Sequence, residues 1–294
     1  MGIINDSEKI KGLRKQIFIT GYKGGMAHFA SCFSCLEMIY ALYEKGLLNY
    51  NPQNAKWEDR DRFILSKGHA GLALYSVLMD VGLITKEMFA SYLQSDSLIG
   101  GEPCMRDCEW IEASTGSLGH GLSLGVGMAM ALKADKKMSK VIVMLGDGEC
   151  QEGSIWEAAI MASAMKLDNL VVILDNNKVQ KMDLVKNTIG VPLWKEKWES
   201  FGWKTYETDG HDIDAFVCTM NEIKKEINKE INEEIKNDSS LESVDKPKIV
   251  IANTIKGKGV SIMENNPNWH FKIPGKKELK YFKEELGVMD EELL

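Results

Sequence analysis

The sequence of 294 residues contains no apolar run near the roughly 18 residues that a membrane-spanning helix needs. Its start, MGIINDSEKI, has no apolar signal core, and Asp6 stands where a myristoylation signal needs serine or threonine. Acidic residues outnumber basic ones by 43 to 36, and no cluster of lysine and arginine is present. We therefore expect a cytoplasmic protein whose main partner is neither a membrane nor a nucleic acid.

The six cysteines do not indicate a disulfide framework, because a chain of this size without a leader is expected to keep its thiols reduced. Cys32 and Cys35, with His28 four residues before them, invite comparison with a zinc site. Such a site needs four ligands, and the other close pair is Cys104 and Cys108. Cysteines within an apolar helix are more often small core residues, which is the preferred interpretation.

Two apolar runs form the centre of the chain. Val141–Leu145 ends at Gly-Asp-Gly, Leu170–Leu174 ends at Asp-Asn-Asn, and a helical pattern lies between them. Two buried strands joined by a crossover helix make a βαβ unit, which requires a parallel sheet. Ligands of such sheets bind beyond the carboxyl ends of the strands. Asp147 and Asn177 are expected at that edge.

The remaining pattern predicts an α/β protein. Helices are predicted over residues 6–20, 32–45, 66–79, 85–93, 121–135, 151–164 and 212–236, with strands over 62–65, 203–208 and 248–254. Residues 237–247 are expected to be a surface loop. No repeat or linker divides the chain, so residues 1–294 are taken as a single domain, a parallel sheet with helices on both faces.

Two predicted helices have unusual compositions. Gly121, Gly125 and Gly127 lie within a helical pattern, where each glycine costs ~1 kcal/mol relative to alanine. Close approach of another backbone is the commonest reason, so this helix is expected to be buried and at a subunit interface. The crossover helix is expected to have an apolar side made of Trp156, Ala159, Ile160 and Ala164.

The strand ends indicate a phosphate-bound cation. Asp147 and Asn177 offer hard oxygen ligands suited to Mg²⁺ or Ca²⁺, and Mg²⁺ usually completes its shell with substrate phosphates and water. Gly146 and Gly148 let the backbone approach such phosphates closely. His69, at a strand-to-helix junction, either faces an anion or caps its own helix. No GxxxxGK(S/T) is present, and no GxGxxG follows a strand, so neither a P-loop nor a dinucleotide site is indicated.

Five segments, taken in order, resemble the transketolase family: DRFILSKGHAGLALY, EASTGSLGHGLSLGVGMAMA, LGDGECQEGSIWEAA, KLDNLVVILDNN and KGKGVSIMENNPNWH. In particular, GDG followed by Asn-Asn is similar to the family's thiamine diphosphate motif. The resemblance extends from about Gly12 to His270 and implies the thiamin-diphosphate-binding fold of the PP (diphosphate-binding) domain.

The resemblance also implies that this sequence corresponds to only part of a full-length transketolase. The family's pyrimidine-binding and C-terminal domains, with the glutamate that activates the aminopyrimidine ring, have no counterpart in this sequence. We therefore expect the N-terminal subunit of a split transketolase. Its partner would be a separate C-terminal subunit that carries the pyrimidine-binding domain, in an α2β2 assembly.

The roles of individual residues follow from the same resemblance. Mg²⁺ (or Ca²⁺) would be bound by Asp147, Asn177 and the main-chain carbonyl of Val179. Thiamine diphosphate would be contacted by His69, Gly116, Leu118, Gly146, Asp147, Gly148, Glu149, Asn177 and His270. The residues expected to act on substrate are His28, His270 and Glu102, the two histidines through proton transfer and binding of sugar hydroxyls. Glu152 and Glu157 match family acids at the dimer interface.

Glu102 departs from the family pattern. It lies in Gly-Gly-Glu-Pro, where the family usually has Gly-His-Pro and the histidine contacts the donor's oxygens. A carboxylate there repels a developing alkoxide unless it is protonated. Either the loop has drifted or the substrate is altered, and both interpretations stay open. His120, where glutamine is common, is a milder change.

Three functions are compatible with these motifs. The first is transfer of a two-carbon ketol unit from a sugar or sugar-phosphate donor to an aldose acceptor, which His28, His69 and His270 favour. The second is another thiamine diphosphate-dependent carboligase or decarboxylase subunit with a non-standard donor, which Glu102 keeps open. The third is a non-catalytic scaffold, against which the intact pair of Asp147 and Asn177 weighs.

Overall fold

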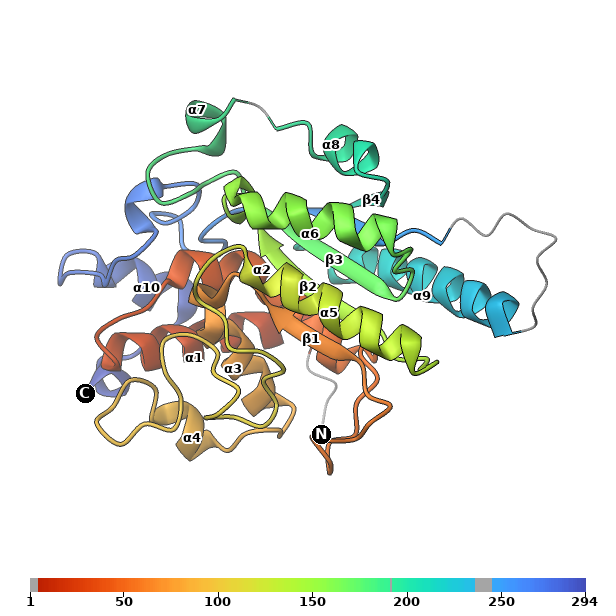
Figure 1. Ribbon diagram of the computed structural model, residues 1–294. Helices are drawn as coiled ribbons and strands as arrows, with labels where there is room; N and C mark the ends of the chain where they lie inside the picture. Colours follow the sequence, from red (N-terminus) through yellow and green to blue (C-terminus); the bar gives the residue numbers. More distant parts are fainter. Residues whose placement is uncertain (1–4, 191, 236–244) are drawn as a thin grey trace.

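The structure, a computed structural model, describes residues 5–190, 192–235 and 245–294. Its five strands form one sheet in which all neighbouring strands are parallel (Figure 1). Across the sheet the order is β1 (Arg62–Leu65), β2 (Val141–Gly146), β3 (Leu170–Asn176), β5 (Lys248–Asn253) and β4 (Lys204–Asp209). The carboxyl ends of β1, β2, β3 and β5 therefore lie side by side.

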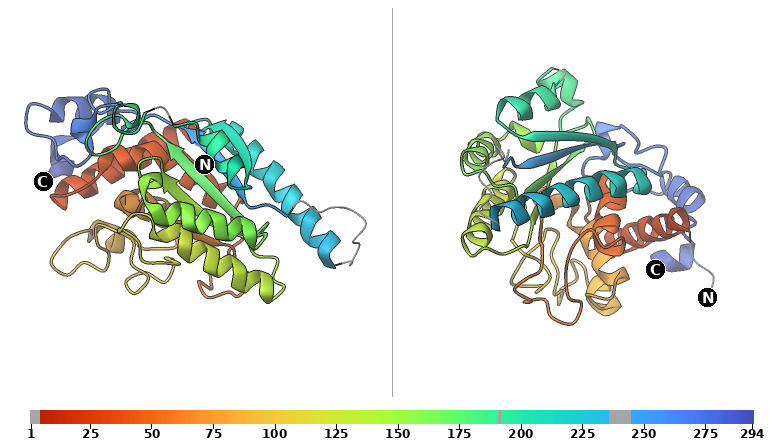
Figure 2. Two further views of the ribbon diagram at one scale, coloured as in Figure 1. Left: turned by 45° about the horizontal axis from the view of Figure 1, so that its top comes forward. Right: turned by 90° about the vertical axis from the view of Figure 1, so that its right-hand side faces the viewer.

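Helices cover both faces of this sheet (Figures 1 and 2). One face carries α1 (Asp6–Lys23), α2 (Phe29–Glu44), α3 (Gly71–Asp80), α4 (Lys86–Ala90), α9 (Ile213–Ile235) and α10 (Leu279–Leu286). The other carries α5 (His120–Ala134), α6 (Gly153–Ala164) and α8 (Trp194–Ser200). Short helical turns are α7 (Val185–Thr188), η1 (Gly68–Ala70), η2 (Glu149–Gln151), η3 (Pro267–Trp269) and η4 (Asp290–Leu293). In Figure 2 the C-terminal segment lies against α1.

The strands alternate between two hydrophobic clusters. In β2, Ile142 and Met144 belong to the hydrophobic cluster that includes residues of α1, α2 and α3, whereas Val143 and Leu145 belong to the cluster that includes residues of α5 and α6. All six residues of β2 are buried, as expected for a parallel strand covered on both faces. The predicted class, a parallel sheet with helices on both faces, is confirmed.

Most predicted elements lie where the sequence placed them, with shifted ends. The predicted helix over residues 66–79 begins as the turn η1, and the one over residues 85–93 is only the short α4. Most of the predicted surface loop, residues 237–244, lies outside the described residues. No helix of the described chain is both long and apolar enough to cross a bilayer.

The predicted apolar side of the crossover helix is wrong in part. The side of α6 that faces the sheet consists of Ile155, Ala158, Ala159 and Ala162. Ile160 is 57% exposed, and Ala164 is also exposed. The helix is apolar nearly all round, so spacing alone did not identify the stripe that meets the sheet.

Close packing explains two of the three glycines in α5 but not the third. A Cβ on Gly125 would lie 2.5 Å from Val143 Cγ2, and one on Gly121 would lie 2.4 Å from Ser66 Oγ. These two glycines therefore let α5 approach β2 and the end of β1. A Cβ on Gly127 would meet nothing within 4 Å.

This difference gives a matched pair of substitutions. Gly125→Ala should lower the free energy of unfolding by about 1–2 kcal/mol, because the added methyl overpacks the helix–sheet contact. Gly127→Ala should raise it by up to ~1 kcal/mol through helix propensity alone. Urea unfolding of the chain measures both, and equal effects of the two substitutions would contradict this packing account.

Candidate functional site

A cavity of about 350 Å³ lies at the carboxyl ends of the strands. Its lining includes all the residues predicted for metal, cofactor and substrate: His28, His69, Glu102, Gly116, Leu118, Gly146, Asp147, Gly148, Glu149, Asn177, Val179 and His270. They come from segments that are far apart in sequence and that the parallel sheet brings to one edge. Their individual roles stay predictions.

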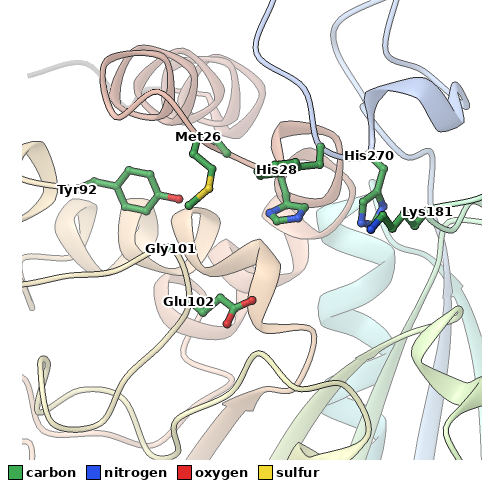
Figure 3. Close-up of a pocket in the computed structure, with 9 residues that line it drawn as sticks. Met26, His28, Tyr92, Gly101, Glu102, Lys181 and His270 are labelled. Carbon is green, nitrogen blue, oxygen red and sulfur yellow. The ribbon is translucent and has the colours of Figure 1, made fainter. Parts of the chain in front are cut away.

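A second hollow, of about 620 Å³, adjoins the first, and His28, Glu102, Lys181 and His270 line both. Figure 3 shows His28 and His270 near each other, Lys181 beside His270, and Glu102 across the hollow. The apolar part of its wall includes Met26, Tyr92 and Phe271.

Three residues that offer hard oxygen atoms, Asp147, Asn177 and Val179, line the cavity beyond β2 and β3. Asp147 is 2% exposed, and its carboxylate accepts hydrogen bonds from the main-chain N–H groups of Lys178 (2.5 Å) and Gly148 (2.7 Å). Asn177 Oδ1 accepts from the N–H of Val179 at 3.1 Å. The carbonyl of Val179 accepts from the Lys256 ammonium at 2.8 Å.

The chemistry of these donors fits Mg²⁺. Burial, with the nearby charge of Asp175, raises the pKa of Asp147 to about 7. A buried carboxylate that ionises so reluctantly is stabilised by a cation beside it. A carboxylate, an amide oxygen and a carbonyl that already accepts from an ammonium group are oxygen ligands of the type that Mg²⁺ prefers. The residues present therefore fit the metal.

Two buried lysines at this edge were missed from the sequence. Lys67 follows β1 and is 1% exposed, and Lys256 follows β5 and is 2% exposed. Lys67 pairs with Asp175 at 2.5 Å. Burial, with the charge of Lys67, lowers the pKa of Lys256 to about 8. Both lysines follow strands and therefore reach the edge where ligands of parallel sheets bind, but the sequence does not show that they are buried there. Gln180, Lys181 and Met182 also line the cavity.

Three imidazole rings form a cluster at the mouth of the cavity. The ring centroids of His28, His69 and His270 are 5.1 to 5.5 Å apart. Burial, with the charges of the neighbouring lysines, lowers the pKa of His28 to about 4 and that of His270 to about 3, and that of His69 also falls. All three rings are therefore neutral at neutral pH.

His270 has a defined tautomer. Its Nδ1 lies 2.9 Å from Lys256 Nζ, and an ammonium group can only donate. Nδ1 is therefore the acceptor, and the proton of the neutral ring is on Nε2. That N–H is available to donate a hydrogen bond to a substrate oxygen.

Glu102 lies directly on the backbone of Gly116. Gly116 has φ +147°, and a Cβ there would be 1.9 Å from Glu102 Oε2. Only glycine leaves room for this approach. The main-chain carbonyl of Glu102 accepts a hydrogen bond from the Tyr75 hydroxyl at 3.0 Å, which holds the loop against α3.

Glu149 lines the cavity, but its oxygens bind the protein. Oε1 accepts from Ser66 Oγ at 2.5 Å and from the N–H of Gly119 at 2.9 Å, and Oε2 accepts from the N–H of Gly146 at 3.1 Å. These bonds tie the ends of β1 and β2 to the start of α5. The side chain therefore supports the wall of the cavity.

Three other residues singled out from the sequence do not line this cavity. Glu152 is the N-cap of α6, Glu157 lies on the exposed side of α6, and both are exposed. His120 is the exposed first residue of α5, and its Nδ1 lies 3.2 Å from the carbonyl oxygens of Ser117 and Leu118.

Sequence comparisons point to one family. The family model described as transketolase, thiamine diphosphate binding domain, matches residues 19–293. The chain is 36% identical over 282 residues to a protein of Actinobacillus succinogenes that is named as one subunit of an apulose-4-phosphate transketolase, with 95% of each chain covered. It is 35% identical over 242 residues to 6-deoxy-6-sulfo-D-fructose transketolase subunit SqwG of Clostridium sp., with 82% of each covered.

Solved structures agree with these relatives. A transketolase variant from Pichia stipitis aligns with a TM-score of 0.82 and 27% identity over 99% of this chain. The transketolase of Campylobacter jejuni aligns with a TM-score of 0.79 and 26% identity over 97% of it. The chain covers 43% of each of those proteins. The predicted thiamine diphosphate-binding fold is confirmed.

The neutral histidines give a pH prediction. Below the usual pKa of 6.5 the unfolded chain takes up protons on His28, His69 and His270, whereas the folded chain does not. Their contribution to stability is therefore lost as the pH falls, by up to about 2 kcal/mol for each ring between pH 7 and pH 5. Asp147 opposes this trend. Because its pKa is raised in the folded chain, it takes up one proton there as the pH falls, and this uptake favours the folded state.

Nitrogen NMR shifts of the histidine rings at pH 5.5 should report neutral imidazoles for these three residues. Urea unfolding should show a smaller loss between pH 7 and pH 5 for His28→Gln than for the unsubstituted chain. Imidazolium shifts for His28 and His270 at that pH would contradict the assignment.

Proposed function

The chain belongs to the transketolase family, in its thiamine diphosphate-binding part, and we propose that it is the thiamine diphosphate- and Mg²⁺-binding subunit of a transketolase-like transferase. The reaction would move a two-carbon ketol unit from a sugar or sugar-phosphate donor to an aldose acceptor. The observation that carries this proposal is the meeting of Asp147, Asn177 and Val179 with three neutral histidines in one cavity.

Asp147, Asn177 Oδ1 and the carbonyl of Val179 would hold Mg²⁺, and the metal would bridge to the diphosphate. Gly148 and His69 line the same cavity and would face the diphosphate. Gly116 and Leu118 would lie against the aminopyrimidine and the middle portion of the cofactor. When bound, thiamine diphosphate supplies an acidic ring carbon that can take up and release the two-carbon unit.

The protein's own groups would position the substrate. His28 is neutral, so it can donate one hydrogen bond and accept another, whereas His270, whose Nδ1 accepts from Lys256, can donate from Nε2. Such groups suit the hydroxyls of a sugar and can move a proton between its oxygens. Lys181 lines both cavities and offers a positive charge to a phosphate or another anionic end of the substrate.

A separate subunit would complete the site. The relatives from Actinobacillus succinogenes and Clostridium are named as subunits, which supports a split enzyme. We propose a partner with the pyrimidine-binding domain in an α2β2 assembly. The exposed apolar side chains of Leu124 on α5 and of Ile160, Met161 and Met165 on α6 support an interface over these helices. All six thiols are unpaired, which supports a cytoplasmic location.

A second candidate concerns the donor. Glu102 places a carboxylate on Gly116, inside the cavity where the cofactor would lie. This position supports an altered donor, or another thiamine diphosphate-dependent carboligation or decarboxylation. A carboxylate would favour a donor that presents hydrogen-bond donors at the reacting end.

Cofactor binding is tested by thermal unfolding of the chain with its partner. Thiamine diphosphate and Mg²⁺ at about 100 times their dissociation constants should stabilise the complex by about 2.7 kcal/mol, and Asp147→Ala should abolish this effect. Asp209→Ala is the matched control, because Asp209 ends β4 at the same edge but does not line the cavity. No shift for the unsubstituted complex would refute cofactor binding.

The role of Glu102 is tested by changing its charge and shape separately. If Glu102 selects the donor, Glu102→His should change the ratio of kcat/KM between two donor ketoses by about tenfold or more, equal to ~1.4 kcal/mol. Glu102→Gln keeps the size and removes the charge, so it tests whether the charge alone is responsible. Unchanged donor ratios in both variants would favour simple drift of the loop.

A further inference from the structure

A buried carboxylate lies beneath the proposed metal ligands without lining the cavity. Asp175, in β3, is 0% exposed. Its Oδ2 accepts from Lys67 Nζ at 2.5 Å, from Ser34 Oγ at 2.6 Å and from Asn177 Nδ2 at 3.0 Å. Its Oδ1 accepts from the hydroxyl of Thr254. One carboxylate thus connects α2, the end of β1, the end of β3 and the segment after β5.

The contact with Lys67 makes Asp175 Oδ2 an acceptor. An ammonium group can only donate, so the oxygen that lies 2.5 Å from Lys67 Nζ carries no proton. The same oxygen lies 3.0 Å from the side-chain amide of Asn177. Only the NH₂ end of that amide can therefore face Asp175.

The orientation of this amide decides which atom faces the cavity. With Nδ2 fixed on Asp175, Oδ1 lies on the opposite side of the amide, where it accepts from the N–H of Val179 at 3.1 Å. Reversal of the amide would direct an NH₂ group at the metal position. An NH₂ group cannot bind a cation, so the site would lose one of its three oxygen ligands.

We propose that Asp175 is the positioning residue of the metal site: it fixes the amide of Asn177 with its oxygen toward Mg²⁺, and Lys67 balances its charge. This inference rests on the proposed function, because that oxygen is the proposed metal ligand. Groups that orient a metal ligand from behind typically change metal affinity by about 10- to 100-fold when they are removed.

The test uses the full chain with its partner, and Mn²⁺ with thiamine diphosphate as the probe. Electron paramagnetic resonance reports free Mn²⁺ and thereby the dissociation constant. Asp175→Asn has the same size but can present either end of its own amide to Asn177. Its affinity for Mn²⁺ should fall by about 10-fold or more.

A second substitution distinguishes an effect on the orientation of the Asn177 amide from a general loss of structure at the metal site. Asn177→Asp supplies a ligand whose two ends are both oxygen, so it needs no orienting partner. The double variant Asp175→Asn/Asn177→Asp should therefore recover most of the lost Mn²⁺ affinity. Ser34→Ala is the matched control: it removes another hydrogen bond to the same Asp175 oxygen, so it should lower the urea midpoint but leave Mn²⁺ affinity within about twofold.

The possible failures are distinguishable. No Mn²⁺ binding by the unsubstituted complex would refute the proposed function itself. Normal binding together with unchanged affinity in Asp175→Asn would overturn only the positioning role. A loss that Asn177→Asp does not recover would assign Asp175 a merely structural role and overturn the proposal as well. If Asp175→Asn does not fold, Lys67→Met/Asp175→Asn removes both buried charges and carries the same expectations.

Discussion

The ion pair of Lys67 and Asp175 is the interaction on which the rest of the site depends. Both side chains are buried, and burial of two charges is costly unless the remaining polar atoms are satisfied. Here they are, because Lys67 also donates to the carbonyl of Ser31 and to Ser34 Oγ, and Asp175 accepts from three further side chains. The pair holds α2 against the ends of β1 and β3, and Asn177, one of the proposed metal ligands, donates a hydrogen bond to Asp175.

The same buried charges set the chemistry of the cavity. Burial, with the charges of Lys67 and Lys256, keeps His28 and His270 neutral, so that these rings would offer hydrogen bonds rather than positive charge to a substrate. Burial, with the charge of Asp175, makes Asp147 reluctant to ionise, which favours a site with a divalent cation beside Asp147. Cofactor, metal and substrate would thus bind next to buried charges, such as those of Lys67 and Asp175, that are already paired with opposite charges.

The apolar runs revealed the sheet and the strand-end residues Gly146, Asp147, Gly148 and Asn177, whereas most of the remaining cavity lining was expected from the resemblance to the transketolase family. Apolar runs mark the parallel strands, and a ligand of such a sheet can lie only beyond their carboxyl ends. The sequence did not reveal Lys67, Lys256 or Asp175, because a lysine in a polar loop has the pattern of a surface residue and its burial arises from segments distant in the chain. Ile160 was misplaced because α6 is apolar nearly all round, and only packing selects the stripe that meets the sheet.

The most direct test of the account is the position of the metal. A crystal of the chain with its partner, grown with Mn²⁺ and thiamine diphosphate, can be measured near the manganese absorption edge. The account predicts one anomalous peak bound by the Asp147 carboxylate, Asn177 Oδ1 and the carbonyl of Val179, next to the diphosphate. Bound thiamine diphosphate with no peak at these atoms, or a peak held by other residues, would contradict it.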